Sequence, residues 1–230
     1  MALHSNSNAL LEPVLRLGRG ALLERLLTKP IHSGEVLFES GAPIIHFIFP
    51  HGGIISLQAI LNDGRTVERT SIGREDAVGI TEYALGQRFA PCRAVVAVSG
   101  RASWLPVDDL NPMLSDCSEM RELVQKCHTR LISSLIQSVA CASVHSASQR
   151  LATWLLCAGD RADTQQLDLT QRTLADIFGL RLATISDACS RLHAAGAINQ
   201  GRGHLTIINR ELLRKQACEC YDRWTEIRGL

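Results

Sequence analysis

The chain has 230 residues, 46% of them hydrophobic, and a formal net charge of +1 at pH 7. This length allows one large domain or two modest ones, each with its own core, and we expect two. No apolar run approaches the roughly 20 residues that span a bilayer. The first residues lack the basic leader and apolar core of a secretory signal, so we expect a cytoplasmic protein without a membrane partner.

The first half of the chain carries the pattern of an antiparallel β domain that follows an apolar helix over Leu10–Leu27. Short runs of β-branched residues alternate with Gly and Pro, and Asn62-Asp63-Gly64 is a strong hairpin signal. Several strands at this spacing indicate a sandwich or a β-roll. The predicted strands are Glu35–Phe38, Ile44–Phe49, Ile54–Ile60, Val67–Ile72 and Arg93–Val98.

After Pro112 the pattern changes to that of a long helix. Apolar or small residues recur at alternating spacings of four and three, which makes a narrow stripe suited to a second helix of the same kind. We expect this stripe to be the seam of a homodimer, and the alternative is that the helix packs on its own β domain. The stripe consists of Met120, Val124, Cys127, Leu131, Ser134 and Ser138.

Residues 169–196 indicate two short helices joined by a turn. Thr170 is suited to cap the first helix, because its hydroxyl can accept a backbone N–H, and Gly179 is suited to end it. A capping box from Ser146 to Gln149 predicts a further helix before this pair, to about Ala158. The second helix of the pair buries Ile185, Ala188, Cys189 and Leu192 and exposes its N-terminal part. This is a helix-turn-helix pattern, and an ordinary helical hairpin is the alternative.

Residues 197–208 resemble a short β-hairpin with Gly201-Arg202-Gly203 at its tip, and a last helix is predicted over Arg210–Ile227. A helix pair followed by such a hairpin is a winged arrangement, in which the second helix enters the major groove of DNA and the wing meets phosphate or the minor groove. The candidate DNA-binding residues are Thr170, Gln171, Arg172, Arg181, Leu182, Ala183, Thr184, Ser186, Asp187, Arg191, Arg202 and His204.

The eight cysteines are scattered and lie mostly in apolar helical contexts. In a reducing cytosol such residues behave as small hydrophobes. Only Cys218 and Cys220 are close in the sequence, and a single pair one residue apart is weak evidence for a metal. We therefore expect a structural or surface role for this pair, with no metal and no cofactor in the protein.

In this order, a β-roll, a long helix and a winged helix resemble the Crp/Fnr superfamily of bacterial transcription regulators, from about Leu22 to Tyr221. The likeness rests on Gly34–Gly41, Phe49-Pro50, Gly53–Leu57, Gly73–Glu75, Val78-Gly79, Gln137-Ser138, Ala140-Cys141, His145-Ser146, Gln149–Ala152, Trp154–Leu156, Arg202-Gly203 and Ala217–Tyr221. It implies an α+β fold: a jelly-roll-like sensor domain with its N-terminal helix at 1–112, a dimerisation helix at 113–145 and a winged helix-turn-helix domain at 146–230. It also implies a homodimer on a two-fold-symmetric operator, without enzymatic activity, and contact with RNA polymerase if the protein is an activator.

The cyclic-nucleotide cassette of this family is degenerate here. Ile80 replaces the glutamate that holds the ribose after Gly79, and Cys92-Arg93 replaces the Arg-Ser/Thr pair that holds the cyclic phosphate. An apolar side chain cannot accept the ribose hydrogen bond, so we expect no cyclic AMP binding of the usual kind and an effector that the sequence does not identify. The candidate effector-binding residues are Glu75, Gly79, Ile80, Cys92 and Arg93.

The reading helix also departs from the family. Family members often read guanine with an arginine and cytosine with a glutamate early in this helix. The matching positions here hold Leu182, Ala183 and Asp187, with Arg181 one position earlier. The resemblance therefore implies a different operator, in which apolar side chains contact thymine methyl groups.

Two other functions compete with this interpretation. A protein-interaction module that has lost DNA binding is compatible with the exposed Asp187 and with an excess of only two basic residues after position 145. A cupin-like metalloenzyme would need several histidines and a carboxylate around one metal, and His46 and His51 show no such motif. We do not expect haem ligation by His32, His46 or His51. An N-terminal iron–sulfur cluster is not expected either, because the chain has no cysteine before Cys92.

Overall fold

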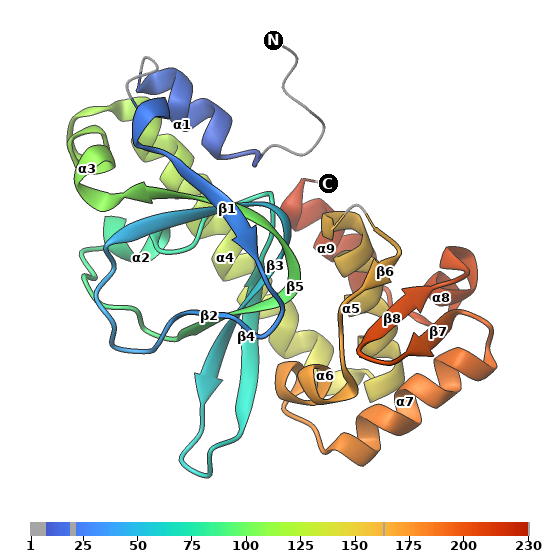
Figure 1. Cartoon of the computed structure of the whole chain (residues 1–230). Coiled ribbons are helices and arrows are strands. Elements are labelled where there is room, and N and C mark those ends of the chain that lie inside the picture. The colour runs from blue at the N-terminus through green and yellow to red at the C-terminus, as the bar shows by residue number, and fades with distance from the viewer. Residues whose placement is uncertain (1–7, 19–21, 163, 230) are drawn as a thin grey trace.

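A β-roll, a long helix and a C-terminal helical domain follow one another in the computed structural model, which describes residues 8–18, 22–162 and 164–229 (Figure 1). In Figure 1 the long helix α4 runs from the α1 and α3 end of the roll to the C-terminal domain. None of the helices in the described parts of the chain combines the length and hydropathy that a membrane span requires.

The roll is one antiparallel five-stranded sheet in the order β1-β5-β3-β4, with β2 also paired to β5. Its strands are β1 (Leu27–Ile31), β2 (Val36–Phe38), β3 (His46–Ile60), β4 (Thr66–Ile72) and β5 (Arg93–Pro106). The two strands predicted over residues 44–60 are thus one, which shifts register against β5 between Pro50 and Ile55. Gly53 permits this bend, because its φ is +80° and an added Cβ would lie 2.5 Å from the Val98 carbonyl oxygen.

The predicted helix over Leu10–Leu27 is wrong after its first half. Helix α1 spans Leu11–Leu17, a 3-10 turn (η1) spans Leu23–Arg25, and the chain then enters edge strand β1. Pro30 is tolerated in β1, because an edge strand need not donate a hydrogen bond on its outer side. The roll also contains a short helix, α2 (Ile80–Ala84), that the strand pattern did not predict.

Helix α3 (Val107–Asp116) leads into α4 (Ser118–Val144), whose apolar stripe faces its own roll. Met120, Val124 and Cys127 are 0%, 4% and 0% exposed and lie in one core with Phe47 and Leu105. The prediction that these residues form the dimer seam is therefore wrong at Met120, Val124 and Cys127, where the alternative, packing of the helix on its own β domain, is correct. The rest of the stripe, Leu131, Ser134 and Ser138, is also wholly or partly buried.

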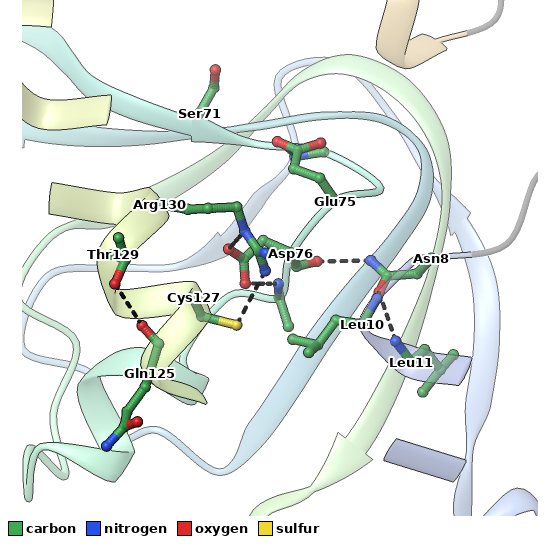
Figure 2. A network of polar contacts seen from close by, with 12 residues as sticks. Asn8, Leu10, Leu11, Ser71, Glu75, Asp76, Gln125, Cys127, Thr129 and Arg130 are labelled. Carbon is green, nitrogen blue, oxygen red and sulfur yellow. Dashed lines mark hydrogen bonds and ion pairs between the residues drawn. The ribbon is translucent and has the colours of Figure 1, made fainter. Parts of the chain in front are cut away.

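A polar network around Asp76 ties α4 and the N-terminal segment to the roll (Figure 2). The Asp76 carboxylate pairs with Arg130 of α4 at 3.1 Å, and its carbonyl accepts a 2.7 Å hydrogen bond from the Asn8 side chain. The Asn8 amide also donates to the Pro50 carbonyl, and its oxygen caps α1 by accepting backbone N–H groups at 2.9 Å. Asp76 thereby holds α4 through its carboxylate and the N-terminal segment through its backbone carbonyl.

The C-terminal domain is a helical unit around a three-stranded sheet in the order β6-β8-β7. Its elements are α5 (Ala147–Ala162), β6 (Gln166–Leu167), α6 (Gln171–Phe178), α7 (Leu182–Ala194), β7 (Ile198–Gly201), β8 (His204–Ile207), α8 (Arg210–Gln216) and α9 (Cys220–Arg228). The predicted capping box is present, since the Gln149 side chain accepts the Ser146 N–H at 3.0 Å and the Ser146 hydroxyl accepts the Gln149 N–H at 3.4 Å. The single last helix predicted over Arg210–Ile227 is instead broken into α8 and α9.

Helix α5 attaches this domain to the roll through buried polar contacts. Its Arg161 donates to the Ser71 hydroxyl at 2.8 Å, to the Ser71 carbonyl at 3.0 Å and to the Glu75 carboxylate. Further along α5, the Trp154 indole donates to Glu68 of β4 at 3.2 Å. These hydrogen bonds and the buried ion pair hold the C-terminal domain against the roll.

Candidate nucleic-acid interface

The helix pair α6 and α7 has the local structure that its sequence predicts. The Thr170 hydroxyl accepts the Thr173 N–H at 3.0 Å and caps α6. Gly179 ends α6 at a φ of +62°, where other residues are strained. The four residues predicted to form the inner face of α7 are all buried: Ile185, Ala188, Cys189 and Leu192. This anchored face fixes the direction in which the opposite side of α7 points.

The N-terminal part of α7 is open to solvent. Arg181 is its N-cap residue, and Leu182, Ala183, Thr184 and Asp187 are exposed while Ser186 is half-buried. The positive end of the helix dipole at this terminus favours an approaching phosphate. Ser190, which sequence reasoning did not select, is also exposed one turn beyond Ser186, and its hydroxyl donates to the Ser186 carbonyl at 2.9 Å.

The wing lies beside α7, as the hairpin of β7 and β8 (Figure 1). Arg202 occupies its exposed tip, and His204 is half-buried at the start of β8. The Gln171 side chain of α6 donates to the Gln200 side chain of the wing at 2.6 Å. Gln171 thus holds the wing against the helix pair, a role that its position in the sequence did not indicate.

The arginines of this domain fall into two groups. Some are engaged with acidic or aromatic side chains; these are Arg150, Arg161, Arg210, Arg214, Arg223 and Arg228. The other four are exposed, and within the described parts of the chain none of them forms an ion pair or a hydrogen bond through its side chain; these are Arg172, Arg181, Arg191 and Arg202. All four belong to α6, α7 and the wing tip. This division leaves free positive charge on the helix-turn-helix and its wing.

The predicted effector residues have other partners. The Glu75 carboxylate pairs with Arg161, and Arg93 pairs with Glu39 at 3.3 Å. Ile80 and Cys92 are buried, and Gly79 is the N-cap residue of α2. Burial alone would raise the pKa of Glu75, but the charges of nearby arginines and its hydrogen bonds together hold that pKa below its usual value. These five residues therefore offer no free anion site, because their charged groups are paired and the others are buried or part of the backbone turn before α2.

A cavity of about 370 Å³ lies instead between the roll and the C-terminal domain. Residues of β4, α4, α5, α6 and α9 line it, among them Glu68, Ser138, Trp154 and Phe178. One carboxylate oxygen of Glu68 is buried without a hydrogen-bond partner, and burial raises the pKa of this group. A cavity of this size suits a small ligand.

The histidines weighed for a metalloenzyme do not converge. His51 contacts the Ser103 hydroxyl, and burial followed by the charge of Arg101 lowers its pKa. Among the described residues, one group of three or more metal-ligating side chains is present, and neither His46 nor His51 belongs to it. That group consists of Cys141, His145, Cys218 and Cys220.

Comparison with known proteins agrees with this architecture. Residues 149–216 match the family model of the Crp-like helix-turn-helix domain. No relative among curated proteins matches the chain. FixK2 from Bradyrhizobium japonicum is similar in structure, with 18% identity, a TM-score of 0.69 and coverage of 84% of this chain and 98% of that one.

Two further structures have the same fold. A Crp/Fnr-family putative transcriptional regulator from Eubacterium rectale has 15% identity and a TM-score of 0.68, covering 90% of this chain and 97% of its own. The c-di-GMP-responsive global regulator CLP of Xanthomonas campestris has 12% identity and a TM-score of 0.66, covering 84% and 99%. The chain therefore has the fold of the Crp/Fnr-type regulators and carries a Crp-like helix-turn-helix domain at residues 149–216.

Proposed function

We propose that the chain is a homodimeric transcription regulator that binds double-stranded DNA through α7 and the wing. The observation that carries this proposal is the division of the arginines, which leaves four guanidinium groups on α6, α7 and the wing tip without a partner among the described residues. The formal charge of the whole chain is only +1, so general attraction to DNA is weak and these groups must supply the phosphate contacts.

The base-reading residues would be those at the exposed start of α7. Arg181 can form a bidentate contact with guanine, and Leu182 and Ala183 can contact thymine methyl groups. Asp187 repels phosphate but can accept a hydrogen bond from cytosine. The operator should therefore differ from those read by an arginine and a glutamate at the matching positions.

The experiment is a selection of binding sites from random DNA duplexes with the full chain, followed by salt titration on the enriched duplex. Arg202→Ala should weaken binding to every sequence and reduce the slope of log K against log salt by about 1. Arg181→Ala should cost roughly 1 to 3 kcal/mol on the enriched duplex and relax the preference at one base pair.

Arg223→Ala is the matched control, because this arginine is also exposed but pairs with Glu226 on α9. It should leave DNA binding unchanged. If no duplex is enriched and binding does not depend on salt, the chain does not bind DNA and the interaction-module alternative gains support. Equal losses from Arg223→Ala and Arg202→Ala would contradict the assignment of the wing.

We place the dimer contact on the outer face of α4. Ile132, Ile136 and Val139 are 57%, 66% and 68% exposed, and they follow the four-then-three spacing of a helix-pairing seam. Thr129 and Ser143 extend this spacing in both directions and are also exposed. Pairing two such faces would remove an unpartnered apolar stripe from water, which is the usual driving force for helix association.

We assign effector binding to the cavity between the roll and the C-terminal domain in place of the degenerate cassette. The unpartnered Glu68 oxygen calls for a hydrogen-bond donor, and the Trp154 and Phe178 rings offer apolar contact. Thermal-shift screening of small molecules against the wild type and Glu68→Ala tests this assignment. A ligand that stabilises both proteins equally would place its site elsewhere.

A further inference from the structure

The four side chains at the junction of α4 and α9 form a group with the composition of a structural zinc site. The ligand atoms of Cys141, His145, Cys218 and Cys220 all lie within 4.8 Å of one another. Three cysteines and one histidine around a closed site are a common ligand set for structural Zn²⁺. The sequence pattern did not indicate that Cys141 and His145 lie beside Cys218 and Cys220, since Cys141 and Cys218 are 77 residues apart.

Two of the six distances between the ligand atoms match tetrahedral coordination. At the tetrahedral angle, a Zn–S bond of about 2.3 Å and a Zn–N bond of about 2.0 Å place two sulfurs about 3.8 Å apart and a sulfur and a nitrogen about 3.5 Å apart. The Cys141 and Cys218 sulfurs lie 3.7 Å apart, and the Cys220 sulfur lies 3.6 Å from His145 Nδ1. Two edges of the tetrahedron thus already have lengths close to those expected. Each of them joins one ligand of the α4 end, Cys141 or His145, to one of the two cysteines that precede or start α9.

The histidine is oriented as a metal ligand is. Its Nε2 lies 3.2 Å from the Glu219 carboxylate, which accepts the Nε2–H and leaves Nδ1 free to bind on the side of the sulfurs. The His145 side chain is only 11% exposed, so its Nδ1 faces Cys220 inside the protein and is not turned toward solvent. Carboxylate support of this kind is typical of histidines that bind zinc.

The surroundings of Cys218 also suit a thiolate ligand. The Thr153 hydroxyl accepts the Cys218 N–H at 3.1 Å and lies 3.0 Å from its sulfur. Cys157 belongs to the same hydrophobic core but not to the ligand group, so it serves as a control cysteine for the site.

We propose that Cys141, His145, Cys218 and Cys220 bind one Zn²⁺ ion as a Cys₃His structural site that joins the end of α4 to the start of α9. His145 is the residue at which α4 ends, and the capping box of α5 begins at the next residue. The ion would therefore clamp the joint between the long helix and the helix-turn-helix domain. This site does not depend on DNA binding or on an effector.

The test is metal analysis of the full chain, produced in zinc-supplemented medium and purified without a histidine tag. We expect about one Zn²⁺ per chain in the wild type and in Cys157→Ser, and loss of zinc in Cys220→Ser and His145→Ala. Removal of zinc with a chelator should lower the melting temperature of the wild type but not of Cys220→Ser.

Because the variants can lose zinc through misfolding, a second measurement uses the wild type alone. Titration of the chelator-treated chain with Co²⁺ should produce the sulfur-to-cobalt charge-transfer and ligand-field bands of a tetrahedral thiolate site. Wild-type protein without zinc and without these bands would overturn the proposal, as would an equal loss of zinc from Cys157→Ser. A Cys141–Cys218 disulfide found by mass spectrometry in metal-free protein purified under reducing conditions would also overturn it.

Discussion

The buried ion pair between Arg161 of α5 and Glu75 of the roll allows a quantitative test of how the C-terminal domain is held. Their side chains are 2% and 6% exposed, and Arg161 also supplies both hydrogen bonds to Ser71. Replacing Arg161 with methionine keeps much of the side-chain volume but leaves a buried carboxylate without its counter-charge. Removing one partner of such a pair destabilises a protein by about 3 to 5 kcal/mol.

We expect Arg161→Met to lower the free energy of unfolding by that amount, a large part of the roughly 5 to 15 kcal/mol of a typical protein. The double variant Arg161→Met/Glu75→Met should be more stable than Arg161→Met alone, because no unpaired charge remains. The control is Arg223→Met, which breaks a surface pair whose side chains are 64% and 62% exposed and should cost less than about 1 kcal/mol.

Urea unfolding followed by tryptophan fluorescence gives these differences. The sign of the pH effect is fixed as well: the pKa of Glu75 is lowered in the folded protein, so its stabilisation is complete above the unfolded pKa of about 4.3 and is lost as the pH falls through the folded value. The reasoning fails if Arg161→Met costs no more than Arg223→Met, or if the double variant is less stable than Arg161→Met.

Three further predictions follow from single positions. Ile136→Glu, which places charge on the outer face of α4, should convert a dimer to a monomer in light scattering while circular dichroism stays unchanged. Gly179→Ala should destabilise by about 1 to 2 kcal/mol and more than Gly203→Ala in urea unfolding, since both have positive φ but only at Gly179 would the Cβ lie 3.0 Å from a side chain of the roll. Glu68→Gln should raise the free energy of unfolding at pH 7, because burial raises the pKa of this carboxyl; the gain should vanish below about pH 4, where both states are protonated.

The helix-turn-helix was predictable because its signals are local. A cap hydroxyl at Thr170, an αL glycine at Gly179 and a four-residue apolar face on α7 act over one or two turns of helix, and each has the predicted role in the structure. The hairpin at Asn62–Gly64 is equally local, with the Leu61 N–H donating to the Arg65 carbonyl at 2.8 Å. Short-range chemistry of this kind does not require knowledge of the partner surface.

The errors come from features that depend on a partner. The spacing of Met120, Val124 and Cys127 correctly indicates that they share a helix face, but a spacing does not reveal whether a second chain or the roll covers that face. The outer face with Ile132 and Ile136 has the same periodicity, but the predicted seam did not include it. Two stripes on one helix are what a helix needs when it packs on its own domain and also on a second copy.

The metal-ligand group escaped prediction for a related reason. Cys218 and Cys220 have too short a spacing to indicate a site alone, and Cys141 and His145 complete the group only through the packing of α9 on α4. The break between α8 and α9 makes this possible, because a continuous helix over Arg210–Ile227 would point Cys218 and Cys220 in different directions. The same break was the main error in the predicted C-terminal helix.

The contacts of the β3–β4 hairpin suggest how the proposed cavity would communicate with the reading helix. Val67 of β4 packs against Gly179, in the turn that orients α7, and Thr66 donates to the Asp176 carbonyl at 3.5 Å. Glu68, which follows Val67 in β4, lines the cavity and accepts a hydrogen bond from the Trp154 indole of α5. Strand β4 thus contacts the α6–α7 turn through Thr66 and Val67 and helix α5 through Glu68, so a movement of β4 would change both contacts. If the proposed cavity is coupled to DNA binding, this turn is one route between the roll and α7, and the bonds of Arg161 and Trp154 of α5 to the roll are a second route.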